Sequence, residues 1–237
     1  MKGVSRFATS RTVVGMTDQT PMNPVLAIIP LGDYQTNGFV VADDTDPDRC
    51  WIVDCGQRPT PLLEAVEASG RTPAGIVLTH CHHDHIAGID EALTRFGPMP
   101  IRCHAAEAAW NGDPMLNLSA FLGAPATATP PDGVFGEEDP CPLGPTWRIL
   151  HLPGHSPGSC GFLHEPTGTL IAGDTLFEGS IGRIDFPTSD PEAMRGSLRR
   201  ILALDDATRV LPGHGGETTV GRERAGNPFV EGGEPRF

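Results

Sequence analysis

The chain has 237 residues, 38% of them hydrophobic and 20% charged, which is the composition of a globular protein rather than a disordered one. Its formal net charge is −13, so a nucleic-acid-binding function has no electrostatic basis. No stretch approaches the roughly 18 apolar residues that a membrane span requires, so we expect neither nucleic acid nor membrane as a partner.

The N-terminal residues 1–22 contain the basic residues Lys2, Arg6 and Arg11 but no apolar core. This composition predicts a flexible extension rather than a secretory signal. The remaining residues, 23–237, are predicted to form one domain.

Six cysteines occur without any Cys-x-x-Cys spacing and without an export signal. We therefore expect reduced thiols and a cytoplasmic location rather than a disulfide framework. Cys81, which lies between two histidines, is expected to point away from them and to pack as a buried thiol.

The first elements are predicted to form the edge of a sheet. Three strands are expected, over residues 25–30, 38–42 and 50–54. The acidic stretch 43–48 lacks the glycine and distal glutamate of a calcium-binding loop, so it is predicted to be a solvated hairpin loop. A helix is then predicted from Thr60, acting as its N-cap, to Gly70, with Pro61 at the first helical position.

A cluster of histidine and aspartate follows the next predicted strand, residues 75–78. Its ligand-type residues, in the spacing His-x-His-x-Asp-His, are His80, His82, Asp84 and His85. A helix is predicted over residues 86–96 by apolar residues at helical spacing, so the cluster lies on a strand-to-helix turn. Imidazole and carboxylate suit zinc and its neighbours, and four such groups on one turn could serve two metal ions. The alternative is a polar surface turn rich in histidine.

The middle of the chain is predicted less clearly. A strand over residues 101–104 is followed by an alanine-rich helix towards Trp110. Residues 115–142 show a weak pattern and are predicted to be a long loop or insertion, which either covers the site or is inert.

The second half of the chain repeats the alternation of strands and helices. Strands are predicted over residues 147–152, 161–164, 169–172 and 209–211, and an amphipathic helix over residues 191–203. His155, Asp174 and His214 each stand just beyond a predicted strand end, beside glycine. Strand ends on one edge of a sheet point into a common crevice, so these residues are expected to join the first cluster. Taken singly, each is also an ordinary turn or capping residue.

The full set of residues resembles the ligand set of the metallo-β-lactamase superfamily. The resemblance implies a mixed α/β fold, the four-layer αββα sandwich, with two divalent metal ions at the edge between two sheets. Zinc is the first expectation, with iron or manganese as alternatives. One ion would be held by His80, His82 and His155 and the other by Asp84, His85 and His214, and Asp174 would bridge them.

Finer motifs resemble the compact, glyoxalase II-like branch of that superfamily, which lacks a C-terminal helical domain. They are Gly173-Asp174-Thr175-Leu176-Phe177, Gly179-Ser180-Ile181-Gly182-Arg183 and the stretch from Pro212-Gly213-His214 to Asn227-Pro228-Phe229. The resemblance implies hydrolysis of a small-molecule thioester, such as an acylglutathione, by a metal-bound hydroxide. The carboxylates Asp84 and Asp174 would act in catalysis as metal ligands.

Two residues are expected to contact the substrate. Arg183 could bind a substrate carboxylate, or it could brace its own loop against Asp185. Asn37 could line the rim of the site, or it could be an ordinary turn residue.

Three other functions remain open at this point. The first is a persulfide dioxygenase on the same fold, with one iron held by His80, His155 and Asp174. Lactonase or β-lactamase activity comes next, and a non-catalytic metal-binding protein last. The sequence leaves the acyl group, the thiol and the oligomeric state open.

Overall fold

The computed structural model describes residues 22–123 and 125–237. The extension predicted for residues 1–22 therefore lies outside the described residues, apart from Met22. Within the described ranges, no helix is both long and apolar enough to cross a lipid bilayer.

The first sheet has six strands in the order β1-β2-β3-β4-β5-β6. Their bounds are β1 Val25–Leu31, β2 Thr36–Ala42, β3 Arg49–Val53, β4 Thr72–Val77, β5 Ile101–His104 and β6 Gly133–Phe135. Strands β1 to β3 are antiparallel neighbours, whereas β3 to β6 are parallel. The predicted strands are confirmed within a few residues, but β6 was not predicted because it lies in the weakly patterned loop.

The second sheet has five strands in the order β13-β12-β9-β8-β7. Their bounds are β7 Trp147–His151, β8 Cys160–His164, β9 Thr169–Gly173, β12 Arg209–Pro212 and β13 Thr218–Thr219. Only β9 and β12 pair in parallel, and the predicted hairpin of β8 and β9 is confirmed. Two small hairpins complete the strands, formed by β10 Leu176–Phe177 with β11 Ser180–Ile181 and by β14 Val230–Glu231 with β15 Glu234–Pro235.

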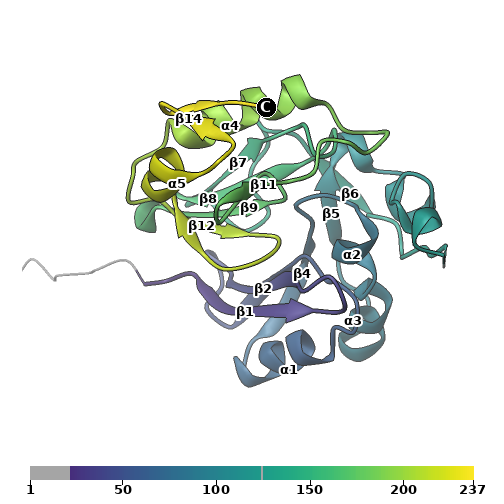
Figure 1. Cartoon of the computed structure of the whole chain (residues 1–237). Helices are drawn as coiled ribbons and strands as arrows, with labels where there is room; N and C mark the ends of the chain where they lie inside the picture. The colour runs from purple at the N-terminus through teal and green to yellow at the C-terminus, as the bar shows by residue number, and fades with distance from the viewer. Residues whose placement is uncertain (1–21, 124) are drawn as a thin grey trace, which may run out of the picture.

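The helices cover the outer faces of the two sheets (Figure 1). Their bounds are α1 Thr60–Ala68, α2 His83–Ile86, α3 Ile89–Phe96, α4 Pro191–Leu202 and α5 Val220–Gly226. Short 3-10 turns occupy Ala105–Glu107, Trp110–Gly112, Ser119–Leu122 and Glu165–Thr167.

Three details of the helix prediction are wrong. Thr60 does not cap α1, since its hydroxyl donates to the Glu91 carboxylate and Pro59 is the N-cap. The helix predicted over residues 86–96 is divided at Gly88, where a Cβ would lie 2.3 Å from the Gly56 carbonyl oxygen. The alanine-rich helix after β5 is a pair of 3-10 turns. Tertiary hydrogen bonds outweigh helix propensity there, for example the bond that the Asn111 amide donates to the Thr129 carbonyl.

Three apolar clusters divide the molecule into four layers. The central cluster joins the two sheets, with Phe39, Val53 and Val77 from the first and Trp147, Phe162, Ile171 and Leu211 from the second. A second cluster packs α1 and α3 on the first sheet, and a third packs α4 on the second. This is the αββα sandwich that the family resemblance implied, and Figure 1 shows α1 and α4 on opposite sides of it.

The acidic stretch 43–48 is the hairpin loop that the sequence predicted, between β2 and β3. The Asp43 carboxylate orders it by accepting hydrogen bonds from the Thr45 and Asp46 backbone and from the Trp51 indole. All six cysteines are free, as predicted. Cys81 is fully buried in the cluster beneath the first sheet.

Candidate metal centre

The predicted ligands meet at one edge of the sandwich because each follows a strand end. His80 and His82 follow β4, and Asp84 and His85 lie in α2, the turn of helix that comes next. The second sheet contributes the rest, with His155 beyond β7, Asp174 beyond β9 and His214 beyond β12. Glycine permits the close approach, since a Cβ at Gly213 would lie 2.1 Å from Asp174 Oδ1.

The donor atoms form three groups, within each of which all donors lie within 4.8 Å of one another. These groups are His80–His82–His155, His80–His85–Asp174 and Asp84–His85–His214. The first and third are the two sets that the resemblance implied for separate metal ions. His83 belongs to none of them, and its ring lies 3.2 Å from the Gln57 amide nitrogen.

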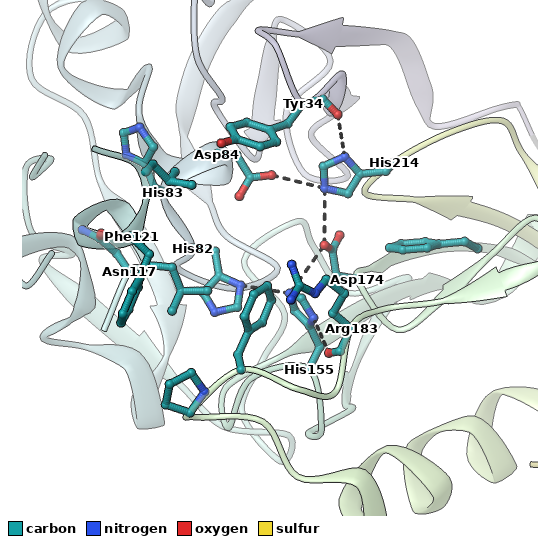
Figure 2. A pocket seen from close by; sticks show the side chains of 15 residues that line it. Tyr34, His82, His83, Asp84, Asn117, Phe121, His155, Asp174, Arg183 and His214 are labelled. Carbon is teal, nitrogen blue, oxygen red and sulfur yellow. Dashed lines mark hydrogen bonds and ion pairs between the residues drawn. The ribbon is translucent and has the colours of Figure 1, made fainter. Parts of the chain in front are cut away.

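Asp174 lies between the two outer groups (Figure 2). Its Oδ1 is 3.5 Å from His85 Nε2, while its Oδ2 is 3.5 Å from His155 Nε2 and 3.3 Å from His214 Nε2. The two oxygens therefore face donors of both groups, which is the position of a bridging carboxylate.

Several donor atoms at this centre are buried without any hydrogen-bond partner. They are Nε2 of His80, His82 and His85 and Oδ1 of Asp174. Buried polar atoms in proteins are nearly always paired, and divalent cations bound at the donor groups would supply the missing partners. The donor set thus fits a metal centre in both chemistry and placement.

Three of the histidines are oriented by hydrogen bonds on the ring nitrogen that faces away from the centre. Nδ1 of His85 bonds the Asp54 carboxylate at 2.8 Å, Nδ1 of His155 the Arg183 carbonyl at 2.9 Å, and Nδ1 of His214 the Tyr34 carbonyl at 3.0 Å. Because these acceptors hold the Nδ1 proton, each Nε2 is left to face the centre, as in metal-ligating histidines generally.

Electrostatics divide the centre into a neutral and a charged half. Burial lowers the pKa of His80 and His155 and lowers that of His82 to about 3, so these imidazoles are neutral and ready to ligate. Burial opposes the charge on His214, but hydrogen bonds to Asp174 and Asp84 raise its pKa to about 10. Burial likewise opposes the charge on His85, but Asp84, Asp54 and Asp174 outweigh it and raise the pKa of this residue too. Without bound metal, protons on His85 and His214 therefore balance the carboxylates, and metal ions would take their place.

The family model of the metallo-beta-lactamase superfamily matches residues 31–214, a range that contains every candidate ligand. The chain belongs to the metallo-beta-lactamase superfamily. As a member of it, the protein is a metal-dependent hydrolase.

Three proteins are similar to this metallo-hydrolase over most of its length. Hydroxyacylglutathione hydrolase GloC of Haemophilus influenzae is 33% identical over 218 residues, covering 86% of this chain and 97% of the relative. The crystal structure of BLEG-1 B3 metallo-beta-lactamase is 38% identical with a TM-score of 0.79, over 86% of this chain and 98% of that one. The crystal structure of TTHA1623 in a di-iron-bound form is 35% identical with a TM-score of 0.75, and the match covers 86% of this chain and 100% of that one.

A cavity of about 540 Å³ opens beside the candidate ligands of the metallo-hydrolase (Figure 2). Aromatic and aliphatic side chains supply much of its wall, namely Tyr34, Leu118, Phe121, Leu122, Phe177, Phe186 and Pro187. Leu118, Phe121 and Leu122 come from the 115–142 segment, so this part of the loop lines the site instead of being inert. Tyr34, Phe177 and Phe186 were not predicted, because a single aromatic residue in a loop carries no periodic signal.

The two predicted substrate contacts differ in position. Arg183 lines the cavity, but its guanidinium forms two hydrogen bonds with Asp185, at 2.8 and 2.9 Å, and lies 4.3 Å from the centre of the Phe186 ring. Asn37 is buried and does not line the cavity. Its amide donates to the carbonyls of Pro212 and Gly215, so it supports the His214 turn instead of the rim.

Proposed function

We propose that this metallo-hydrolase cleaves thioesters, of acylglutathione or a related thiol, at a centre of two divalent metal ions, with zinc as the first candidate. The observation that carries the proposal is the Asp174 carboxylate, which lies within 3.5 Å of His155 from the first donor group and of His85 and His214 from the third. The relative named a hydroxyacylglutathione hydrolase supports the substrate class, and the neighbour solved in a di-iron-bound form supports two ions and keeps iron open.

When bound, two divalent cations would supply an acidified water as nucleophile and a Lewis acid for the thioester carbonyl. The protein contributes the orientation. The Thr36 hydroxyl donates a hydrogen bond to Asp84 Oδ2 at 2.8 Å, which helps to orient that carboxylate at the candidate metal centre. A thiolate is a good leaving group, so the mechanism requires no separate general acid.

The residues that line the cavity indicate which parts of a substrate it would accept. Phe121, Phe177 and Phe186 offer an apolar surface beside the ligands, which suits an apolar acyl group and excludes water. Among the described residues lining the cavity, Arg183 is the only lysine or arginine. An anionic glutathione arm would have to compete with Asp185 for it.

Substrate kinetics on two variants test this assignment. If Arg183 binds a glutathione carboxylate, Arg183→Ala should raise KM for an acylglutathione by roughly tenfold, as expected for one charge-assisted hydrogen bond. The same variant should leave KM for a neutral thioester nearly unchanged. Asp185→Asn is the matched control, because it releases Arg183 without removing the cation. Equal effects of Arg183→Ala on both substrates would mean that Arg183 only braces its loop.

The whole proposal is tested by metal analysis together with a panel of thioesters, lactones and β-lactams. We expect two ions per chain and the fastest turnover on thioesters, with both lost in Asp174→Ala. The B3 metallo-beta-lactamase neighbour favours β-lactamase activity as the second candidate, and faster turnover of β-lactams would decide for it. One iron per chain with oxygen uptake would decide for the dioxygenase. The trio His80, His155 and Asp174 is not among the close donor groups found in the described residues.

A further inference from the structure

Glu107 is a fully buried glutamate that the proposed chemistry does not use. It lies in the 3-10 turn after β5, outside every donor group of the candidate metal centre. Among the described residues, no lysine, arginine or histidine forms an ion pair with it. Burying a carboxylate without a countercharge is costly unless its oxygens are well hydrogen-bonded, so its contacts call for an explanation.

Both carboxylate oxygens of Glu107 accept backbone N–H groups from ligand turns. Oε2 accepts from Cys81 N at 2.6 Å, and Oε1 accepts from Gly158 N at 2.7 Å. Cys81 lies between the ligands His80 and His82, and Gly158 lies three residues after the ligand His155. One side chain therefore ties together the turns that carry all three donors of the first group.

The two turns that Glu107 connects belong to different sheets, so Glu107 helps to set the distance between them. The turn of Cys81 follows β4 in the first sheet, and the turn of Gly158 follows β7 in the second. A neutral bond from Cys160 N to the Thr79 carbonyl also joins them, at 2.9 Å. Glu107 adds one hydrogen bond to each turn, and an ionised carboxylate makes such bonds roughly twice as strong as neutral ones.

The Gly158 backbone packs closely against the Glu107 side chain. A Cβ added at Gly158 would lie 2.7 Å from Glu107 Cγ and 2.8 Å from Cδ, closer than real contacts allow. Glycine at position 158 thus lets its backbone approach the carboxylate.

The second donor group has separate supports. His85 is held by Asp54, Asp84 by the Thr36 hydroxyl, and the His214 turn by Asn37. None of these contacts involves Glu107.

We propose that Glu107 is a positioning residue for one of the two metal ions. It sets the spacing of His80, His82 and His155 and hence the affinity of that group, while Asp84–His85–His214 binds independently of it. The inference rests on the proposed two-metal centre but not on the choice of substrate.

The test is metal affinity, measured on the full chain by competition with a chromophoric chelator for Zn²⁺. Glu107→Gln keeps the size of the side chain, but an amide accepts with one oxygen only and turns a donor towards the other N–H. His214→Ala leaves the first group as the intact one, and His155→Ala leaves the second. We expect Glu107→Gln to weaken Zn²⁺ binding by roughly tenfold or more in the His214→Ala background, the order of one charged hydrogen bond. In the His155→Ala background the affinity should change less than about threefold, since that group has its own supports.

Two controls keep the result decisive. Glu223→Gln makes the same change in a buried glutamate that accepts from Gly179 N and the Asn227 amide, and it should leave both affinities unchanged. If Glu107→Gln does not fold, Gly158→Ala perturbs the same contact from the other side and should show the same selectivity. Equal losses in both backgrounds, or none in either, would overturn the inference. A wild-type chain that binds only one Zn²⁺ would instead overturn the two-metal centre.

Discussion

Replacing Asp54 by asparagine should destabilise the metal-free protein strongly. Asp54 is fully buried and accepts from Thr79 N at 2.8 Å, from the Thr79 hydroxyl at 2.7 Å and from His85 Nδ1 at 2.8 Å. Its φ of 57° is in the left-handed region, which asparagine also tolerates, so the substitution isolates the loss of charge.

The loss of stability is large because Asp54 and its partner His85 are both fully buried. Asp84 and Asp54 outweigh the cost of burial and raise the pKa of His85, so the variant leaves a buried cation without its closest partner. Breaking a buried pair costs about 3–5 kcal/mol, and the remaining amide contacts should keep the loss at about 3 kcal/mol. For a protein of this size, that corresponds to a fall in Tm of roughly 6–12 °C.

Thermal and denaturant unfolding in the presence of a chelator would measure the change without any contribution from metal binding. Asp43→Asn is the matched control, because Asp43 also accepts several hydrogen bonds but lies in a half-exposed loop. Its loss should stay within about 1 kcal/mol, as is usual away from the core. Similar losses for both variants would refute the argument that burial sets the cost.

Two further predictions concern Cys81 and His104. Cys81→Ser should leave the metal content unchanged and lower stability modestly, since Cys81 is fully buried and belongs to no donor group. The neighbouring Cys103 thiol and burial raise the pKa of the Cys81 thiol. Loss of one equivalent of metal in this variant would contradict the inferred geometry. His104 should make the protein sensitive to acid, because burial and the stacked ring of His151 lower its pKa from 6.5 to about 4. The folded state then binds fewer protons than the unfolded state between these values, so stability falls as pH drops through this window. His104→Gln should therefore gain stability relative to the wild type from pH 6.5 to pH 4, and a difference that does not depend on pH would show that His104 does not contribute.

The sequence predicted that the candidate ligands lie close together because their positions depend on local pattern. A strand end is visible in a short apolar run, and glycine beside histidine or aspartate marks where a side chain turns into a crevice. His155, Asp174 and His214 were placed in this way, and the structure brings all three together with the first cluster.

What the sequence did not predict depends on contacts between distant segments. The break in the helix at Gly88 arises from the Gly56 backbone, the position of Asn37 from the His214 turn, and the burial of Glu107 from turns on two sheets. None of these partners is near in sequence, so neither the spacing of apolar residues nor the turn-forming residues could indicate these contacts. The pairing of Arg183 with Asp185 was foreseen only as an alternative, because a spacing of two residues allows the contact without requiring it.

Each outer donor group takes ligands from both sheets, His80 and His82 with His155, and Asp84 and His85 with His214. A bound cation would therefore cross-link the two sheets, and its release would weaken the contact between them. An ion present at 1,000 times its Kd adds about 4 kcal/mol to folding stability. The resistance of this protein to proteolysis would then depend on how fully the centre is loaded with metal.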